Sequence, residues 1–335
     1  MNLNLIKEKI FNSKNISVNE TKFIFDLIMN GEISEVEAAG ILIGLKTKSE
    51  SKDELLGAAK SMREKSLKIS SPENTIDTCG TGGDMSGTLN ISTSAAIVAA
   101  SAGAKVAKHG NRSISSRSGS ADMLEKIGYK ISADQSYLEN SLSKNNFCFL
   151  FAQYHHSAMK HVINVRKQLG TRTIFNLLGP LTNPANTKKQ LLGVFDSKWV
   201  KIHCEVLKDL GSKHALVVHG EDGLDEISLS SHTKIAELKD GKIKEYIFNP
   251  QDYGYTLIKN SDIQGKDPDY NAKTFMQMLE GLNKKFQHIV ELNAGAALYL
   301  SQQSKSFKEG FKLARHVIET NITKQFVKKI IKTNG

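Results

Sequence analysis

Cysteine, proline and long apolar runs are all scarce in this sequence. Its 335 residues include 3 cysteines, at positions 79, 148 and 204, and 5 prolines. Cysteines so far apart argue against a disulfide framework and a thiolate zinc site, and they are typical of a reducing compartment. The longest apolar runs, near 95–100 and 147–152, are too short to cross a membrane, and the charged first residues lack a signal-peptide core. We therefore expect a cytoplasmic protein without a membrane partner.

The chain is basic, but its positive charge is spread out. It has a formal net charge of +10 and a pI near 9.2, and its densest lysine cluster lies at 324–332. Lysines dispersed along predicted helices usually form a solvated face. A positive field also attracts a small anionic substrate, so charge alone does not identify the ligand. We do not expect a nucleic-acid partner and keep it only as an alternative.

Residues 1–71 predict a helical domain. Three pairs share the spacing Ser-x-x-Glu: Ser17/Glu20, Ser34/Glu37 and Ser51/Glu54. In such a capping box the Ser side chain accepts a hydrogen bond from an unpaired backbone N–H while the Glu reaches back, so each pair marks a helix start. The apolar faces of these helices are broader than one small bundle buries, which favours packing against another subunit.

The remaining chain, 72–335, predicts an α/β domain. Strand-like segments alternate with amphipathic helical ones, which favours a mostly parallel central sheet covered by helices. The expected strands are 75–79, 104–108, 147–151, 191–195 and 214–218, and the expected helices are 93–102, 119–127, 134–144, 156–168 and 197–210. Asp240-Gly241, between 234–238 and 244–247, indicates a β-hairpin. Three amphipathic helices are expected from about 269.

The most informative segment is Gly80-Thr-Gly-Gly-Asp84, between the first expected strand and the next expected helix. Glycines let the backbone turn where a Cβ would obstruct it, and a loop at a helix start leaves N–H groups aimed at one spot. Such a spot favours phosphate, although a simple tight turn has the same pattern. A second cluster adds fixed charge and donors: Lys108, Asn111, Arg112 and Ser120. One anion with several phosphates would account for both clusters.

These segments resemble the anthranilate phosphoribosyltransferases, of the nucleoside-phosphorylase-like class. The matching segments, in the family's order, are Gly-Thr-Gly-Gly-Asp at 80–84, Asn-Ile-Ser-Thr at 90–93, Lys-His-Gly-Asn-Arg at 108–112, Ser-Gly-Ser-Ala-Asp at 118–122, Thr173 to Pro184, and Asp-Gly-Leu-Asp-Glu at 222–226. The combination is specific, although no single piece is. The resemblance implies transfer of the phosphoribosyl group of phosphoribosyl pyrophosphate (PRPP) to the amine of anthranilate, with release of pyrophosphate, in tryptophan biosynthesis.

The resemblance also implies how the lobes are used. Residues near 156–182 would return to the helical lobe, so that the active site lies between the two lobes. The helical lobe would form a homodimer.

On the donor side, breaking the anomeric bond builds negative charge on the leaving diphosphate. The main demands are therefore charge neutralisation and accurate placement rather than a covalent nucleophile. The residues expected to bind PRPP lie in the loop, at the following helix start and in the second cluster: Gly80, Gly82, Gly83, Asp84, Thr88, Asn90, Ser92, Thr93, Lys108, Asn111 and Ser120.

Asp225 and Glu226 are the best candidates for a metal site. Two adjacent carboxylates in a loop after an expected strand suit Mg²⁺ bridged to diphosphate oxygens. Glu221 and Asp222 compete for this role on chemistry alone. The resemblance favours the Asp225-Glu226 pair, with Ser92 as a third ligand, and implies two Mg²⁺ ions per active site.

For the acceptor, the resemblance points to Arg166, whose guanidinium can pair bidentately with the anthranilate carboxylate. The other expected anthranilate contacts are Gly80, Asn111, His156 and Gly179. His109 is expected to act by positioning, and no residue is assigned as a general base. An enzyme of this class with a different aromatic acceptor stays open at this point.

One departure and two further alternatives accompany this prediction. Met85 stands where loops of the family commonly have glycine, which puts the closing motion of the loop in doubt. One alternative is a pyrimidine nucleoside phosphorylase of the same fold, which has no need of the Asp225-Glu226 pair or of Arg166. The other is a non-catalytic homologue that binds nucleic acid. In such a protein we would expect the loop residues to be substituted, but here they are intact.

Overall fold

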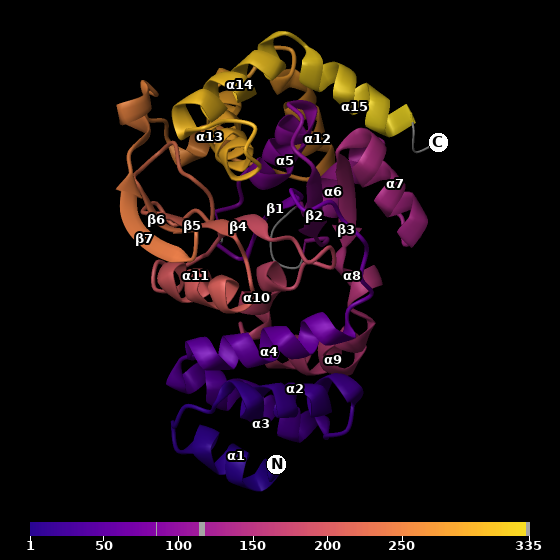
Figure 1. Cartoon of the computed structure of the whole chain (residues 1–335), viewed down its shortest axis with the longest axis vertical. Coiled ribbons are helices and arrows are strands. Elements are labelled where there is room, and N and C mark those ends of the chain that lie inside the picture. The colour runs from indigo at the N-terminus through magenta and orange to yellow at the C-terminus, as the bar shows by residue number, and fades with distance from the viewer. Residues whose placement is uncertain (85, 114–117, 333–335) are drawn as a thin grey trace.

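The computed structural model describes residues 1–84, 86–113 and 118–332. It has two lobes, with a group of N-terminal helices at one end of the molecule and a sheet with its covering helices at the other (Figure 1). The fold class predicted from the sequence is confirmed: a small all-helical lobe and a larger α/β lobe with a mostly parallel sheet. In the described part of the chain, every helix is too short or too polar to cross a membrane.

The helical lobe begins with four consecutive helices: α1 (Leu3–Phe11), α2 (Val18–Asn30), α3 (Glu35–Lys48) and α4 (Lys52–Lys65). Each of the last three starts at a capping box, in which the N-cap residue is Ser17, Ser34 or Ser51. The three helix starts predicted from the Ser-x-x-Glu pairs are therefore present. Helix α9 (Lys160–Leu169) comes from the middle of the chain and packs against α2 and α3.

The α/β lobe is built on one seven-stranded sheet with the order β3-β2-β1-β4-β5-β6-β7. The strands are β1 (Ile76–Gly80), β2 (Val106–Gly110), β3 (Phe147–Phe151), β4 (Lys189–Gly193), β5 (His214–Gly220), β6 (Thr233–Lys239) and β7 (Lys242–Phe248). The first five are parallel and the last two antiparallel. The predicted hairpin joins β6 to β7, and both turn residues have positive φ, 49° at Asp240 and 73° at Gly241.

Alternate residues of the central strands face two different apolar cores. On one face, Leu191, Leu216 and Val218 share a core with α5 (Ile91–Ser101), α12 (Pro268–Met278), α13 (Lys284–Leu300) and α14 (Phe307–Glu319). On the other face, Leu192 and Val217 share a core with α11 (Trp199–Asp209) and the helical lobe. The second core is continuous between the lobes, because α11 packs against both the sheet and α4.

Shorter helices complete the fold: α6 (Ser120–Lys126), α7 (Gln135–Asn145), α8 (Ala152–His155), α10 (Phe175–Leu178) and the 3₁₀ turns η1 (Ser157–Met159), η2 (Gly179–Leu181), η3 (Pro250–Tyr253) and η4 (Asn260–Ile263). The helix expected at 156–168 starts later, after η1. The prediction of three helices after 269 is wrong, since the described part of the tail has four: α12, α13, α14 and α15 (Ile322–Lys332). Neither glycine nor proline separates α14 from α15, and the chain turns at Asn321 with φ 61°.

The crossing of α13 and α14 depends on small residues. A methyl group added to Gly295 would lie 2.6 Å from the backbone nitrogen of Phe311 and 2.7 Å from the carbonyl carbon of Gly310.

We therefore expect Gly295→Ala to lower the free energy of unfolding by about 1–3 kcal/mol through overpacking, measured by chemical denaturation. In α3, a methyl group at Gly40 would meet only the ring of Phe11 at an ordinary 3.6 Å. Gly40→Ala should therefore be stabilising, and equal losses in the two variants would contradict the packing argument.

Candidate functional site

Four parallel strands end in glycine at one edge of the sheet. These strands are β1, β2, β4 and β5, which end at Gly80, Gly110, Gly193 and Gly220. Because the carboxyl ends of parallel strands meet at the same edge, the loops that follow them converge. The glycine loop, residues 80–84, follows β1, and the segment with Asp225 and Glu226 follows β5. Segments far apart in the sequence thus build one site.

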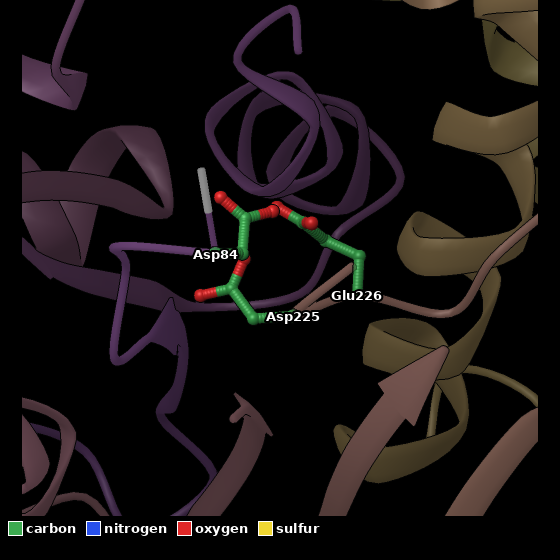
Figure 2. Close-up of side chains that lie close together, drawn as sticks. All are labelled: Asp84, Asp225 and Glu226. Atoms are coloured by element: carbon green, nitrogen blue, oxygen red, sulfur yellow. The ribbon is translucent and has the colours of Figure 1, made fainter. Parts of the chain in front are cut away.

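Three carboxylates meet at this edge. Asp84, at the end of the glycine loop, joins Asp225 and Glu226, and each residue offers an oxygen within 4.8 Å of the others. Figure 2 shows the three side chains turned toward one another from the two loops. Glu226 Oε2 is buried and has no hydrogen-bond partner among the described residues. A buried, unpartnered carboxylate oxygen is costly unless a cation or proton joins it.

Burial and mutual repulsion perturb the ionisation of this cluster. Burial raises the pKa of Asp225 to about 6, and the neighbouring Asp84 contributes to the rise. Burial also raises the pKa of Glu226 well above its ordinary value, with Asp225 as the next cause. Carboxylates packed this closely cannot all be ionised without a compensating positive charge. An all-oxygen set of this kind fits a hard divalent cation such as Mg²⁺.

The other acidic candidates lie elsewhere in the same loop. Asp222 accepts a hydrogen bond from the hydroxyl of Ser228 at 2.8 Å, and Glu221 lies 3.5 Å from the ring of His232. Ser92, the expected third ligand, lines the same small cavity as Asp225 and Glu226. The geometry therefore favours the Asp225-Glu226 pair over its neighbours, with Asp84 as an added member.

Hydrogen bonds fix the first part of the glycine loop to the strands. The N–H of Thr81 donates to the Gly193 oxygen at 2.9 Å, and the N–H of Gly82 donates to Asp225 Oδ2 at 2.8 Å. Gly82 and Gly83 have φ of 62° and 72°, a left-handed conformation that favours glycine. A Cβ at Gly193 would overlap the backbone oxygen of Asp225. The loop backbone therefore contacts the Asp225 carboxylate, and the Asp225 backbone packs against the end of β4.

Lys108 provides a buried positive charge beside the carboxylates. The residue is 1% exposed, and its Nζ donates to the backbone oxygen of Thr78 at 2.6 Å and lies 3.3 Å from Ser92 Oγ. Burial lowers the pKa of Lys108, while the carboxylate of Asp77 opposes this shift. The amine thus lies between β1 and the start of α5, where it can balance anionic groups.

The expected residues at the start of α5 form a polar network. Thr93 Oγ1 donates to Ser120 Oγ at 3.1 Å, which joins α5 to the start of α6. Asn90 Nδ2 donates to the Ser118 oxygen at 3.2 Å, and Asn271 donates to Asn90 Oδ1 at 2.9 Å. Thr88 lies apart, in an isolated bridge with Gln264. The network holds several hydroxyl groups near the helix N-terminus, where the macrodipole favours anions.

Two histidines lie together behind the second cluster. The Nε2 atoms of His109 and His156 are 3.3 Å apart, and burial lowers the pKa of both rings, to about 4 for His156. Both rings are therefore neutral at pH 7 and can act as hydrogen-bond donors or acceptors. Asn111 lies nearby, where its Oδ1 accepts from Gln153 at 3.4 Å and from the backbone N–H of Arg112 at 2.8 Å.

Arg166 stands at the helical-lobe side of the site. It lies on α9, with its guanidinium 5.5 Å from the ring centroid of Phe175, and burial lowers its pKa. Gly179 follows α10 and opens η2. Among the described residues, no hydrogen bond joins Arg166 to His156 or Asn111. Met85 lies outside the described residues, so its effect on the loop stays a prediction.

Two features were missed from the sequence. Asp84 was assigned to PRPP binding but not to the carboxylate cluster, although its place at the end of the glycine loop could have suggested it. Arg172 was not singled out, yet it contacts the glycine loop through the backbone oxygen of Gly83. An arginine between two helical segments carries no pattern that distinguishes it from a solvated one.

Comparisons with known proteins agree with this geometry. Residues 4–66 match the glycosyl transferase family, helical bundle domain, and residues 72–323 match the glycosyl transferase family, a/b domain. Over 316 residues, the chain is 46% identical to the anthranilate phosphoribosyltransferase of Thermoanaerobacter sp. (strain X514), with 94% of each chain covered. The chain belongs to the anthranilate phosphoribosyltransferase family. The family predicted from the sequence is therefore confirmed.

Solved structures of the family have the same fold. Anthranilate phosphoribosyltransferase from Thermus thermophilus superposes with a TM-score of 0.91 at 38% identity, covering 98% of each chain. The enzyme from Saccharomyces cerevisiae in complex with PRPP and Mg has a TM-score of 0.89 at 25% identity, covering 99% of this chain and 97% of that one. These matches favour the transferase over the pyrimidine nucleoside phosphorylase.

The raised pKa of Asp225 predicts a pH-dependent stability. Without a bound metal, burial in the folded protein raises the pKa of Asp225 from its ordinary 3.8 to about 6. Its protonated form therefore favours the folded state, and this contribution is lost as the pH rises from about 4 through 6. We expect Asp225→Asn to be more stable than the wild type by about 1–3 kcal/mol at pH 7.5 in the presence of a chelator, and no more stable at pH 4.

Thermal or chemical unfolding at the two pH values measures this difference. Glu221→Gln removes an exposed carboxylate from the same loop and should change stability little at either pH. If Asp225→Asn were more stable than the wild type by the same amount at both pH values, ionised Asp225 would not be what destabilises the folded state.

Proposed function

We propose that this protein transfers the phosphoribosyl group of PRPP to the amine of anthranilate, giving N-(5-phosphoribosyl)anthranilate and pyrophosphate. The observation that carries the proposal is the meeting of three carboxylates, Asp84, Asp225 and Glu226, under a glycine loop at the carboxyl edge of the sheet. A diphosphate that leaves gains negative charge, which a bound divalent cation can balance, and these carboxylates would supply the ligands of that cation. The membership of the family supports the same reaction.

The donor side of the site neutralises the leaving diphosphate. We assign the loop residues Gly80, Gly82 and Gly83 to backbone contacts with PRPP, and Lys108 to a buried positive charge beside them. The other residues that we assign to PRPP binding are Asp84, Thr88, Asn90, Ser92, Thr93, Asn111 and Ser120. As the bond from the anomeric carbon to oxygen breaks, negative charge grows on the diphosphate, and donors and positive charge at this edge of the sheet would stabilise it.

Asp225, Glu226 and Ser92, together with Asp84, would hold Mg²⁺. Bound there, Mg²⁺ would neutralise the diphosphate and keep its oxygens in place. We propose two ions per site, because three carboxylates and a diphosphate carry more negative charge than one divalent cation balances. The Gly82 N–H now donates to Asp225, so binding of a metal at this carboxylate would free that donor for phosphate.

The acceptor side orients the amine. We assign Arg166 to the anthranilate carboxylate through a bidentate pair, and Gly80, Asn111, His156 and Gly179 to the walls around the ring. The amine nitrogen attacks the anomeric carbon, the diphosphate leaves with the bonding electrons, and the nitrogen gives up a proton to water. His109 and His156 are neutral because burial lowers their pKa, so they orient the amine without adding positive charge near the sugar cation.

The fluorescence of anthranilate tests the reaction. Purified protein with PRPP and Mg²⁺ should reduce it with time, and a chelator should stop the loss. The variant Asp225→Ala/Glu226→Ala should be slower by about 10²-fold or more, because the charge on the leaving group is no longer balanced. Glu221→Ala, in the same loop, serves as the matched control and should retain the wild-type rate within about 3-fold. Wild-type protein that leaves the fluorescence unchanged at every metal concentration would refute the proposal.

We also propose a homodimer formed through the helical lobe. Large apolar side chains are exposed there on helices that pack together: Leu5 and Phe11 on α1, Val36 on α3 and Ile163 on α9. Val36 is 82% exposed. Exposed apolar side chains of this kind are typical of a subunit interface. We further propose a cytoplasmic location, because the three cysteines are buried and free, as in a reducing compartment.

Light scattering at micromolar concentration tests the dimer. Wild-type protein should give twice the 36.9 kDa of one chain, and Val36→Glu should shift it toward the monomer, because a charge would be buried in the interface. Ile247→Glu places the same charge on an exposed residue of β7 and should leave the mass unchanged. A wild-type mass of one chain would end this proposal.

A further inference from the structure

Arg172 connects the helical-lobe side of the site to the glycine loop. It lies between α9 and α10, six residues after Arg166. Its Nη2 donates a hydrogen bond to the backbone oxygen of Gly83, and its guanidinium stacks 4.2 Å from the ring centroid of Phe195. A planar guanidinium can stack and donate in its own plane at once, whereas a lysine ammonium cannot.

The glycine loop depends on two sets of contacts. Its first residues, Thr81 and Gly82, are held by hydrogen bonds that their N–H groups donate to Gly193 and to Asp225. Gly83 is held by Arg172 instead. Phe195 takes part in both sets, because its backbone N–H donates to Thr81 Oγ1 at 3.1 Å while its ring supports the guanidinium. The far end of the loop, next to the carboxylate cluster, is therefore oriented from outside the sheet.

We propose that Arg172 is a positioning residue that orients the peptide between Gly83 and Asp84 for binding the diphosphate of PRPP. A trans peptide is planar, with its N–H opposite to its C=O, so holding the Gly83 oxygen also fixes the direction of the Asp84 N–H. Gly83 has φ 72° and no side chain to restrict it. Without the arginine this peptide would have to be ordered when the substrate binds, which costs affinity. The inference rests on the proposed function.

Substitutions at the stack test this role. Arg172→Lys keeps the charge but loses the stacked, in-plane hydrogen bond, and it should raise KM for PRPP by about 10-fold. Phe195→Leu should raise it by about 3-fold. The double variant Arg172→Lys/Phe195→Leu should have nearly the same KM for PRPP as Arg172→Lys alone, because the ring of Phe195 acts through the guanidinium. KM for anthranilate and the Tm should change little in all three.

Lys167→Ala is the matched control for charge. Lys167 is exposed on α9, close in sequence to Arg172, and its loss should leave KM for PRPP within about 2-fold. An unchanged KM for PRPP in Arg172→Lys would overturn the proposal. So would a lower Tm with both KM values unchanged, since that pattern shows a purely structural role.

Calorimetry separates this inference from the proposed reaction. PRPP with Mg²⁺ should bind Arg172→Lys about 10-fold more weakly than the wild type, whatever the acceptor. A wild-type protein that binds PRPP but leaves anthranilate unchanged would refute the proposed acceptor and still test Arg172. Wild-type protein that does not bind PRPP would overturn both.

Discussion

The repulsion among Asp84, Asp225 and Glu226 is the constraint around which the site is built. Like charges at this spacing separate unless the fold holds them, and here two loops from the sheet edge do so. Burial of Asp225 and Glu226 strengthens the repulsion and raises the pKa of both side chains. The cluster is therefore unfavourable while no positive charge balances it, and the proposed Mg²⁺ would supply that charge. Balancing the charge would remove the repulsion and so stabilise the folded site.

Much of the fold could be predicted because its signals are local. The capping boxes at Ser17, Ser34 and Ser51 and the turn at Asp240-Gly241 need only a few neighbouring residues, and each is present in the structure. Strands buried on both faces, such as β3, stand out as short apolar runs. The tail was harder, because Asn321 turns the chain between α14 and α15 without the glycine or proline that marks most helix ends.

The site was predictable in its parts but not in its connections. The glycine loop and Asp225-Glu226 carry motifs, so their residues could be named in advance. The bond from Gly82 to Asp225 joins positions 143 apart in sequence, and the bond from Arg172 to Gly83 joins positions 89 apart. Such contacts are set by tertiary packing and leave no periodic pattern. The roles of Arg166 and the histidines rest on resemblance for the same reason, since no local signal separates them from ordinary surface or core residues.

The close approach of Gly193 to Asp225 has a consequence for how this enzyme can diversify. Any side chain at Gly193 would strike the backbone of Asp225, and one at Gly80 would strike its carboxylate. Single substitutions at Gly80 or Gly193 therefore disturb Asp225 directly. Arg166 lies outside this set of contacts, on α9, with its guanidinium over the ring of Phe175. We therefore expect sequence change to be tolerated more readily around Arg166 than around Asp225.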